Sequence, residues 1–383
     1  MFLALSEMKR AKVRFGLLTG AVALLVLLIL FLQALLTGLI DQFIGAIEHQ
    51  SGQVLVYNDQ ARKNLEGSRI SDEQSSAIAD AASTAAPGAV TGPLGEGTFT
   101  VVAGDEEQDA VIFGYELGGP GEPTTLVEGR LPEGGDEAVA SSRNAGDGFG
   151  IGDVVEVVPA GGAEPVRFTV VGLADEINYS VAPTLFTDFA SFEEAKLAVN
   201  PDATGVQPSA VAITLPDGAD ASEVARAVAG AVDGVEALTR QEAVDGSPGV
   251  AAVTQSFSVI LLLFYLVVPL VTGLFFLIVT FQKAGALTLL RAIGIRSGRL
   301  VRALLVQVVL VVLGGAVVAT AIFSLIASGS GGSRSLSISV EPTTVGATVG
   351  GILLLALLTS LVSARRVLRI DPIEATTGAG VHL

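Results

Sequence analysis

Four long apolar runs constrain this chain more than any other feature of its sequence. None of them contains a charged side chain, and they cover residues 15–40, 257–281, 303–327 and 343–364. A helix needs about 20 apolar residues to cross the hydrocarbon core of a bilayer, and it satisfies its own backbone hydrogen bonds there. The sequence therefore predicts four transmembrane helices, which we assign to residues 15–40, 253–281, 301–328 and 343–364.

The charged residues predict how these helices are oriented. Twelve of the 22 Lys and Arg residues lie in three segments: before the first run, between the second and third runs, and after the fourth. These three segments together contain only three acidic residues. The segment 41–252 carries nine basic and 35 acidic residues instead. Because basic residues collect on the cytoplasmic side of a membrane, we predict that both termini are cytoplasmic and that 41–252 is extracytoplasmic. The loop 282–300 and the tail 365–383 are then cytoplasmic, and 329–342 is a short outer loop.

The first 40 residues could also be a targeting sequence. The apolar run 15–40 is longer than the ~7–15 residues of a signal-peptide core, and no clean cleavage site follows it. We therefore favour an uncleaved signal anchor over a cleaved signal peptide. Residues 1–14 mix apolar and basic side chains, which indicates a short amphipathic segment on the inner surface, with a disordered basic tail as the alternative.

The segment 41–252 is too long for a loop and must fold as a domain with its own core. Runs rich in Val, Phe and Thr predict strands at 98–102, 110–115, 154–158, 167–173 and 210–215. Helical patterns are found at 72–82, 189–199 and 221–232. The predicted fold class is thus a polytopic membrane protein with four transmembrane α-helices and a large extracytoplasmic α+β domain between the first and second. The chain has no cysteine, so this domain is held by packing alone.

The composition argues against several functional classes. No Gly-Lys pair occurs, so the phosphate-binding loop of an ATPase is missing. The chain has two histidines and no cysteine, so it has few side chains that could form a metal site or a catalytic triad. The apolar runs lack the ionisable groups of ion-coupled transporters, and we interpret their amides Gln33 and Gln307 as packing contacts between helices. We therefore expect no enzyme, no bound metal and no nucleic-acid partner, and any energy for transport must come from another chain.

Three sets of residues resemble one known family. The inner loop residues 288–295, TLLRAIGI, resemble the coupling segment of the MacB/FtsX-type ABC transporter permeases, and 364–375, ending in DPIEA, resemble their C-terminal motif. The patterns at 128–139 and 152–172 resemble the outer core domain of the same family. The resemblance covers nearly the whole chain and implies a cell-membrane location in a bacterium. Residues 1–5 and 56–70 are most similar to its heterocyst-exporter and heme-exporter subgroup.

The resemblance implies a homodimer of permeases that binds two cytoplasmic ABC ATPase subunits, with membrane lipid around it. ATP would be bound and hydrolysed by the partner, and its closure would push on a coupling helix near 284–295. The residues that the resemblance assigns to this coupling are Leu289, Leu290, Arg291, Ala292, Ile293 and Gly294. An alternative for Arg291 is a contact with lipid phosphate at the membrane surface.

The subgroup implies export of an amphipathic or hydrophobic molecule such as heme, as a transported substrate and not as a resident cofactor. Heme iron takes His, Met, Cys or Tyr as axial ligand, and a porphyrin also needs apolar walls. The candidate substrate-binding residues near the outer ends of the first two spans are Phe43, Glu48, His49, Phe257, Phe264 and Tyr265. Two of them also have a plainer interpretation: a surface histidine for His49, and a packing tyrosine for Tyr265.

Other functions stay open at this point. Relatives in the family export lipids, peptides or antibiotics, and an FtsX-like relative transports nothing but regulates cell-wall hydrolases as a mechanotransducer. A membrane-anchored adhesin or receptor would need no ATPase partner, and the coupling-like loop argues against it.

Overall fold

The structure is a computed structural model, and it describes residues 11–282, 297–329 and 342–368. Its contacts divide the chain into two compact units. The sheet unit comprises residues 37–254, and the helical unit comprises the described residues up to Leu36 and from Gln255 onward. The N-terminal segment up to residue 10, the coupling residues 289–294, most of the outer loop 329–342 and the tail from 369 lie outside the described residues.

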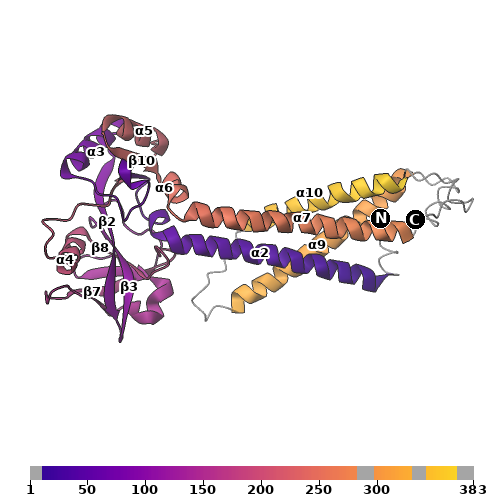
Figure 1. Ribbon diagram of the computed structural model, residues 1–383, viewed down its shortest axis with the longest axis horizontal. Coiled ribbons are helices and arrows are strands. Elements are labelled where there is room, and N and C mark those ends of the chain that lie inside the picture. The colour runs from indigo at the N-terminus through magenta and orange to yellow at the C-terminus, as the bar shows by residue number, and fades with distance from the viewer. Residues whose placement is uncertain (1–10, 283–296, 330–341, 369–383) are drawn as a thin grey trace, which may run out of the picture. The chain divides into compact units, whose positions relative to one another are not determined.

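The helical unit is built from the long apolar helices (Figure 1). These are α2 (Lys12–Glu48), α7 (Val250–Gln282), α9 (Ser297–Gly329) and α10 (Pro342–Leu368). Among the described residues, three helices are long and apolar enough to cross a membrane: Lys12–Glu48, Val250–Phe275 and Leu304–Ile326. The corresponding apolar part of α10, Val345–Leu361, is shorter, so a fourth span remains a prediction.

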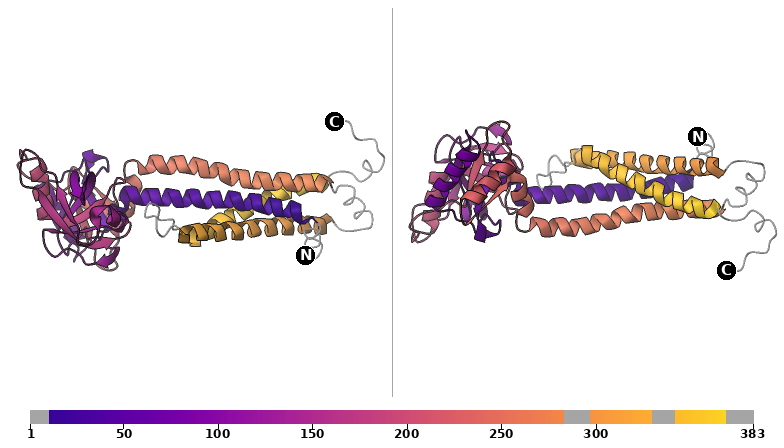
Figure 2. Two further views of the ribbon diagram at one scale, coloured as in Figure 1. Left: turned by 90° about the horizontal axis from the view of Figure 1, so that it is seen from below. Right: turned by 90° about the horizontal axis from the view of Figure 1, so that it is seen from above.

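One apolar cluster holds the helices of this unit together. Val22 and Ile29 of α2 are fully buried against Val311 of α9 and Ile352 of α10. Helices α9 and α10 lie side by side in both views of Figure 2. A Cβ atom at Gly315 of α9 would lie 2.8 Å from Cγ1 of Val22, so the glycine permits the close approach of α2 and α9.

The sheet unit contains ten strands that form one mixed sheet (Figure 1). They are β1 (Val54–Asn58), β2 (Val90–Ala103), β3 (Glu106–Tyr115), β4 (Leu126–Gly129), β5 (Glu137–Ser141), β6 (Val154–Val157), β7 (Val166–Ala174), β8 (Thr184–Asp188), β9 (Ala210–Thr214) and β10 (Val235–Thr239). The strand order is β10-β1-β9-β2-β3-β8-β5-β7-β4, and β6 pairs with β2 and β7. Most neighbours are antiparallel, but β3–β8 and β5–β7 are parallel.

Four shorter helices complete the sheet unit. They are α3 (Asp72–Ala85), α4 (Phe189–Val199), α5 (Ala221–Ala231) and α6 (Arg240–Gly246). Ser71 and Gln74 form a capping box at the start of α3, and Asp220 accepts hydrogen bonds from the first backbone N–H groups of α5. These side chains explain where the two helices begin.

Three buried clusters fill the sheet unit. Helices α3 and α5 pack on β1 and β9, and α4 packs on β2 through Phe192. The central cluster contains the aromatic rings of Phe113 and Phe186, stacked with centroids 5.0 Å apart. It also receives Ile44 and Ile47 from the last turns of α2, each 1% exposed. The C-terminal end of α2 is therefore part of the core of the sheet unit.

The strands and helices predicted for this unit are confirmed, but the sequence analysis missed five strands and one helix. Strand β1 was missed because both its faces are buried: Val54 and Val56 face one cluster, and Leu55 and Tyr57 face another. The alternation that marks a half-buried strand is then absent. Strand β2 begins at Val90 and not at residue 98, because its glycines and proline read as loop residues.

Candidate functional site

The residues predicted to couple the chain to an ATPase, 289–294, lie between the described ends of two long helices. Helix α7 ends at Gln282, and α9 begins at Ser297. Nη1 of Arg14, near the start of α2, donates a hydrogen bond to Oε1 of Gln282 at 2.7 Å. The start of α2 and the end of α7, both predicted to be cytoplasmic, are therefore joined by a side-chain contact.

Polar side chains from three helices meet inside the helical unit. Nε2 of Gln33 donates to the hydroxyl of Tyr265 at 3.3 Å, and this hydroxyl donates to Oγ1 of Thr348 at 3.2 Å. Oγ1 of Thr348 in turn donates to Oε1 of Gln33 at 3.1 Å, which closes a ring of three hydrogen bonds. The prediction that Gln33 is a packing contact between helices is confirmed, and its partners are residues of α7 and α10.

Replacing Tyr265 by Phe is expected to weaken this ring and to destabilise the helical unit by about 1 kcal/mol, the usual size of a hydrogen bond between membrane helices. The substitution removes the acceptor of Gln33 and the donor to Thr348 but keeps the aromatic ring. The measurement is a double-mutant cycle of Tyr265→Phe and Thr348→Val by thermal unfolding in detergent. If the loss of stability in the double variant equals the sum of the losses in the two single variants, the hydrogen bonds of the ring do not act cooperatively.

The candidates at the end of α2 belong to the sheet unit. Phe43 is partly buried against the central cluster, and its carbonyl oxygen accepts a hydrogen bond from the backbone of Ser180. Glu48 is half-buried. The Nε2 atom of His49 lies 3.4 Å from Oε2 of Glu176, and the His49 side chain is 24% exposed. His49 is therefore held in place by an acidic partner while part of its ring stays accessible.

The other three candidates belong to the helical unit. Phe264 and Tyr265 are partly buried against its apolar cluster, and Phe257 is half-buried on α7. The structure thus distributes the six predicted residues over the two units, three in each. No group of three or more His, Asp or Glu side chains with the geometry of a metal site occurs among the described residues.

Sequence reasoning missed one residue with an unusual environment, Glu96 of β2. Its side chain is 2% exposed, and Oε2 has no hydrogen-bond partner in the described part of the chain. Burial raises the pKa of Glu96 from 4.5 to about 7. The available signal was a charged residue between two glycines, Gly95 and Gly97, since glycine inside a strand marks close approach by another group.

Replacing Glu96 by Gln is expected to stabilise the protein above about pH 7, by on the order of 3 kcal/mol from the pKa shift. The native state holds this proton more tightly than the unfolded chain, so the wild type loses stability as pH rises from 4.5 to about 7. The gain should vanish near about pH 4, where the carboxyl is protonated in both states.

Thermal unfolding of both proteins in detergent across this pH range measures the difference. The matched control is Glu106→Gln, at an exposed position on the neighbouring strand β3. A Glu96→Gln gain that does not change with pH would contradict the buried ionisation.

Long apolar helices joined to a folded mixed-sheet domain define a membrane protein with a large domain outside the bilayer. Residues 16–231 match the model of the MacB-like periplasmic core domain, and residues 258–372 match that of the FtsX-like permease C-terminal region. The first match alone spans more than half of the chain. The chain therefore belongs to the MacB/FtsX-type family of ABC transporter permeases, as the motifs predicted.

Relatives over the full length point to one subgroup of this family. The chain is 23% identical to the protein named "Putative hemin transport system permease protein HrtB" of Staphylococcus haemolyticus, and 22% identical to the protein of the same name of Staphylococcus epidermidis. Each alignment covers 99% of both chains. The family and its heme-transport-like subgroup thus agree with the resemblance seen in the sequence.

Solved structures of outer domains are similar only at a low level. The periplasmic region of MacB from Actinobacillus actinomycetemcomitans has a TM-score of 0.36 and 11% identity, and covers 51% of this chain and 92% of that one. The extracellular domain of the ABC-type transporter YknZ from Gram-positive bacteria has a TM-score of 0.30 and 14% identity, with coverages of 45% and 90%.

Proposed function

We propose that this chain is the permease subunit of an ABC-type exporter, driven by ATP hydrolysis on a separate ATPase chain. The observation that carries the proposal is the order of the two family matches: a MacB-like outer domain followed by an FtsX-like permease region in one chain. The coupling-like residues 289–294 fall inside the second match. A homodimer on two ATPases, within the lipid of the cell membrane, completes the proposed assembly.

The proposed topology has four spans, with both termini in the cytoplasm and the sheet unit outside. The distribution of basic residues supports this orientation, since they collect at the predicted inner ends of the helices. Helix α10 (Pro342–Leu368) is the proposed fourth span, and its 27 residues are enough to cross a bilayer core of about 30 Å at 1.5 Å per residue.

The proposed mechanism is rigid-body transmission along helices. Closure of the ATPases would push on the coupling segment and move α7 and α9. Helix α2 runs without a break from Lys12 to Glu48, and α7 begins at Val250, which is buried in the central cluster of the sheet unit. Both units therefore receive residues from the same two uninterrupted helices.

Heme is the proposed cargo, and the names of the full-length relatives support it. Among the candidate residues, His49 is our proposed axial ligand in preference to Tyr265. The Tyr265 hydroxyl already takes part in two hydrogen bonds between helices, which it would have to give up to bind iron. The His49 ring is partly accessible, and the Glu176 carboxylate, with Oε2 3.4 Å from Nε2, can help to orient it, as carboxylates often do for metal-binding histidines.

The cargo is tested by adding hemin to the purified full-length protein and recording the Soret band. We expect a shift with the wild type, its loss in His49→Ala, and its retention in His382→Ala, which removes the second of the two histidines. In cells, the wild type with its ATPase should raise tolerance to hemin. If the wild type gives no shift and no tolerance, heme is not the cargo.

Export of a lipid, peptide or antibiotic is the alternative within the same mechanism. An FtsX-like regulator of cell-wall hydrolases is the alternative without transport. The second alternative is supported if the chain binds a wall hydrolase and the ATPase but protects cells from none of these compounds.

A further inference from the structure

A cavity opens beside β2, in the sheet unit, where the strand lacks a second neighbour. In the described sheet, β2 pairs with β9 over Val90–Leu94 and with β6 over Val101–Ala103, and only β3 accompanies it in between. At this gap the backbone N–H of Glu96 donates to Oγ of Ser209, at 3.1 Å. The cavity has a volume of about 940 Å³, near the upper end of the usual range for small-molecule sites.

One face of α4 forms a wall of the cavity. Phe189, Phe192, Glu193 and Lys196 line it, at the spacing of residues that share a helix face. Glycines let this face approach β2. A Cβ atom at Gly95 would lie 2.3 Å from Cε1 of Phe192, and one at Gly97 would lie 2.1 Å from Nζ of Lys196. Larger residues at either position would displace the side chains that line the cavity.

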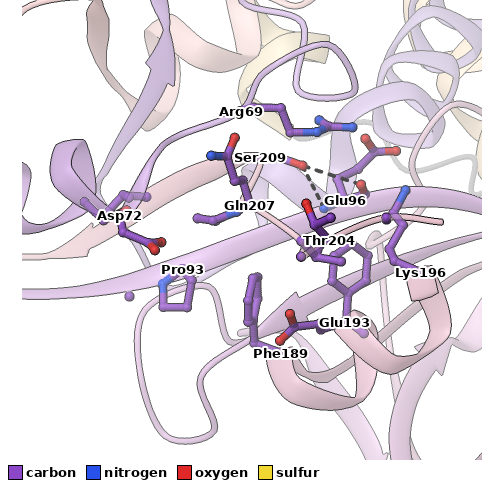
Figure 3. A pocket seen from close by; sticks show the side chains of 18 of the residues that line it. Arg69, Asp72, Pro93, Glu96, Phe189, Glu193, Lys196, Thr204, Gln207 and Ser209 are labelled. Atoms are coloured by element: carbon purple, nitrogen blue, oxygen red, sulfur yellow. Dashed lines mark hydrogen bonds between the residues drawn. The ribbon is translucent and has the colours of Figure 1, made fainter. Parts of the chain in front are cut away.

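The buried carboxyl group of Glu96 and the half-buried ammonium group of Lys196 both face this cavity and do not pair with each other (Figure 3). Oε2 of Glu96 has no hydrogen-bond partner among the described residues. The Lys196 ammonium is near enough to act electrostatically on the Glu96 carboxyl, but the two form no ion pair in the described part of the chain. The Lys196 ammonium lies over the rings of Phe99 and Phe192, at 5.0 and 5.6 Å from their centroids. The described chain offers it no hydrogen bond, and burial lowers its pKa.

Burying an unpaired carboxylate is costly unless another group supplies the missing hydrogen bonds. Arg69 also lines the cavity, and Figure 3 shows its guanidinium on the side where the charged ends of Glu96 and Lys196 gather. Nη1 of Arg69 already donates to the carbonyl oxygens of Glu66 and Ser68. The cavity therefore offers one place for a cation, at Glu96, and one for an anion, at Lys196. The rings of Phe189 and Phe192 supply an apolar surface beside them.

We propose that this cavity is a binding site for a small zwitterion, an amino acid or short peptide, with its ammonium group at Glu96 and its carboxylate at Lys196. Such a molecule satisfies both unpaired groups at once, whereas a simple cation or anion satisfies one of them. The site lies wholly within the sheet unit, and the proposal does not depend on heme being the cargo. It would make the sheet unit a sensor or receptor for peptide-like molecules.

The test measures binding of L-alanyl-L-phenylalanine to the full-length protein in detergent by calorimetry. Three blocked forms of the dipeptide are compared: N-acetylated, C-amidated, and blocked at both ends. We expect each single block to weaken binding about tenfold or more, as for loss of a hydrogen bond to a charged group. This comparison needs no variant and so does not depend on how substitutions affect folding.

Two substitutions assign the ends of the ligand. Glu96→Gln should weaken the affinity for the free dipeptide about tenfold or more and leave the affinity for the N-acetylated form unchanged. Lys196→Met should likewise weaken the affinity for the free dipeptide and leave the affinity for the C-amidated form unchanged. The matched control is Glu194→Gln on α4, at an exposed position outside the lining. Equal affinity for all four forms, no binding at millimolar dipeptide, or an equal loss for every form in Glu96→Gln would overturn the proposal.

Discussion

Replacing Arg291 by Glu is expected to abolish co-purification of the ATPase with this chain. The residue lies in the segment that resembles the coupling helix of the family, and reversal of its charge would place a carboxylate against the partner's acidic groups or helix ends. Removing one member of a buried charge pair at an interface costs about 2–5 kcal/mol, which is roughly a 30- to 5,000-fold loss of affinity. ATP hydrolysis coupled to the permease should fall to background.

A matched control separates docking from membrane insertion. Arg302→Glu makes the same charge reversal near the start of α9, at an exposed position on the same predicted side of the membrane. If Arg291 serves only to contact lipid phosphate, the two variants should behave alike and the ATPase should stay bound. The measurement is the amount of ATPase recovered with each variant, relative to the permease itself.

Replacing Gly45 by Ala is expected to destabilise the sheet unit by about 3 kcal/mol, the upper part of the range for overpacking. Gly45 lies in the buried last turns of α2, and its added Cβ would meet the carbonyl oxygen of Glu176 at 2.1 Å and its carbonyl carbon at 2.9 Å. Both are backbone atoms, which cannot move aside as a flexible side chain would. The loop around Glu176 must shift, and the His49–Glu176 contact should be disturbed with it.

The same substitution elsewhere in α2 should have the opposite sign. Gly20 is exposed, and its Cβ would meet no atom within 4 Å, so Gly20→Ala is expected to be neutral or to stabilise the helix by up to about 1 kcal/mol. Thermal unfolding and limited proteolysis of the full-length variants in detergent compare the two. A Gly45→Ala protein as stable as the wild type would contradict the docking of α2 into the sheet unit.

The sequence predicted the parts of this fold that depend on local pattern. Long charge-free runs predict membrane-spanning helices, and three of the described helices are long and apolar enough for this role. The Asp220 cap marks the start of α5. The sequence could not reveal β1, whose continuous apolar run reflects burial on both faces. The predicted strand also began after Glu96, because glycines suppress the strand pattern in the region where α4 approaches β2.

The candidate site was predictable to a lesser degree. Tyr265 could be named from its place in an apolar run, but its hydrogen bonds depend on three helices that are far apart in the chain. The contact of His49 with Glu176 likewise joins residues from distant segments. The unpaired groups at Glu96 and Lys196 result from a gap between two strand pairings, which no local pattern encodes.

The most direct test of the central claim is ATP hydrolysis by the permease and its ATPase purified together in lipid nanodiscs, with and without hemin. The account predicts a stable complex whose hydrolysis rises severalfold with hemin and falls to background with Arg291→Glu. A chain that retains no ATPase, or a complex whose hydrolysis is the same with and without the permease, would show that this protein does not transmit the stroke of a separate motor.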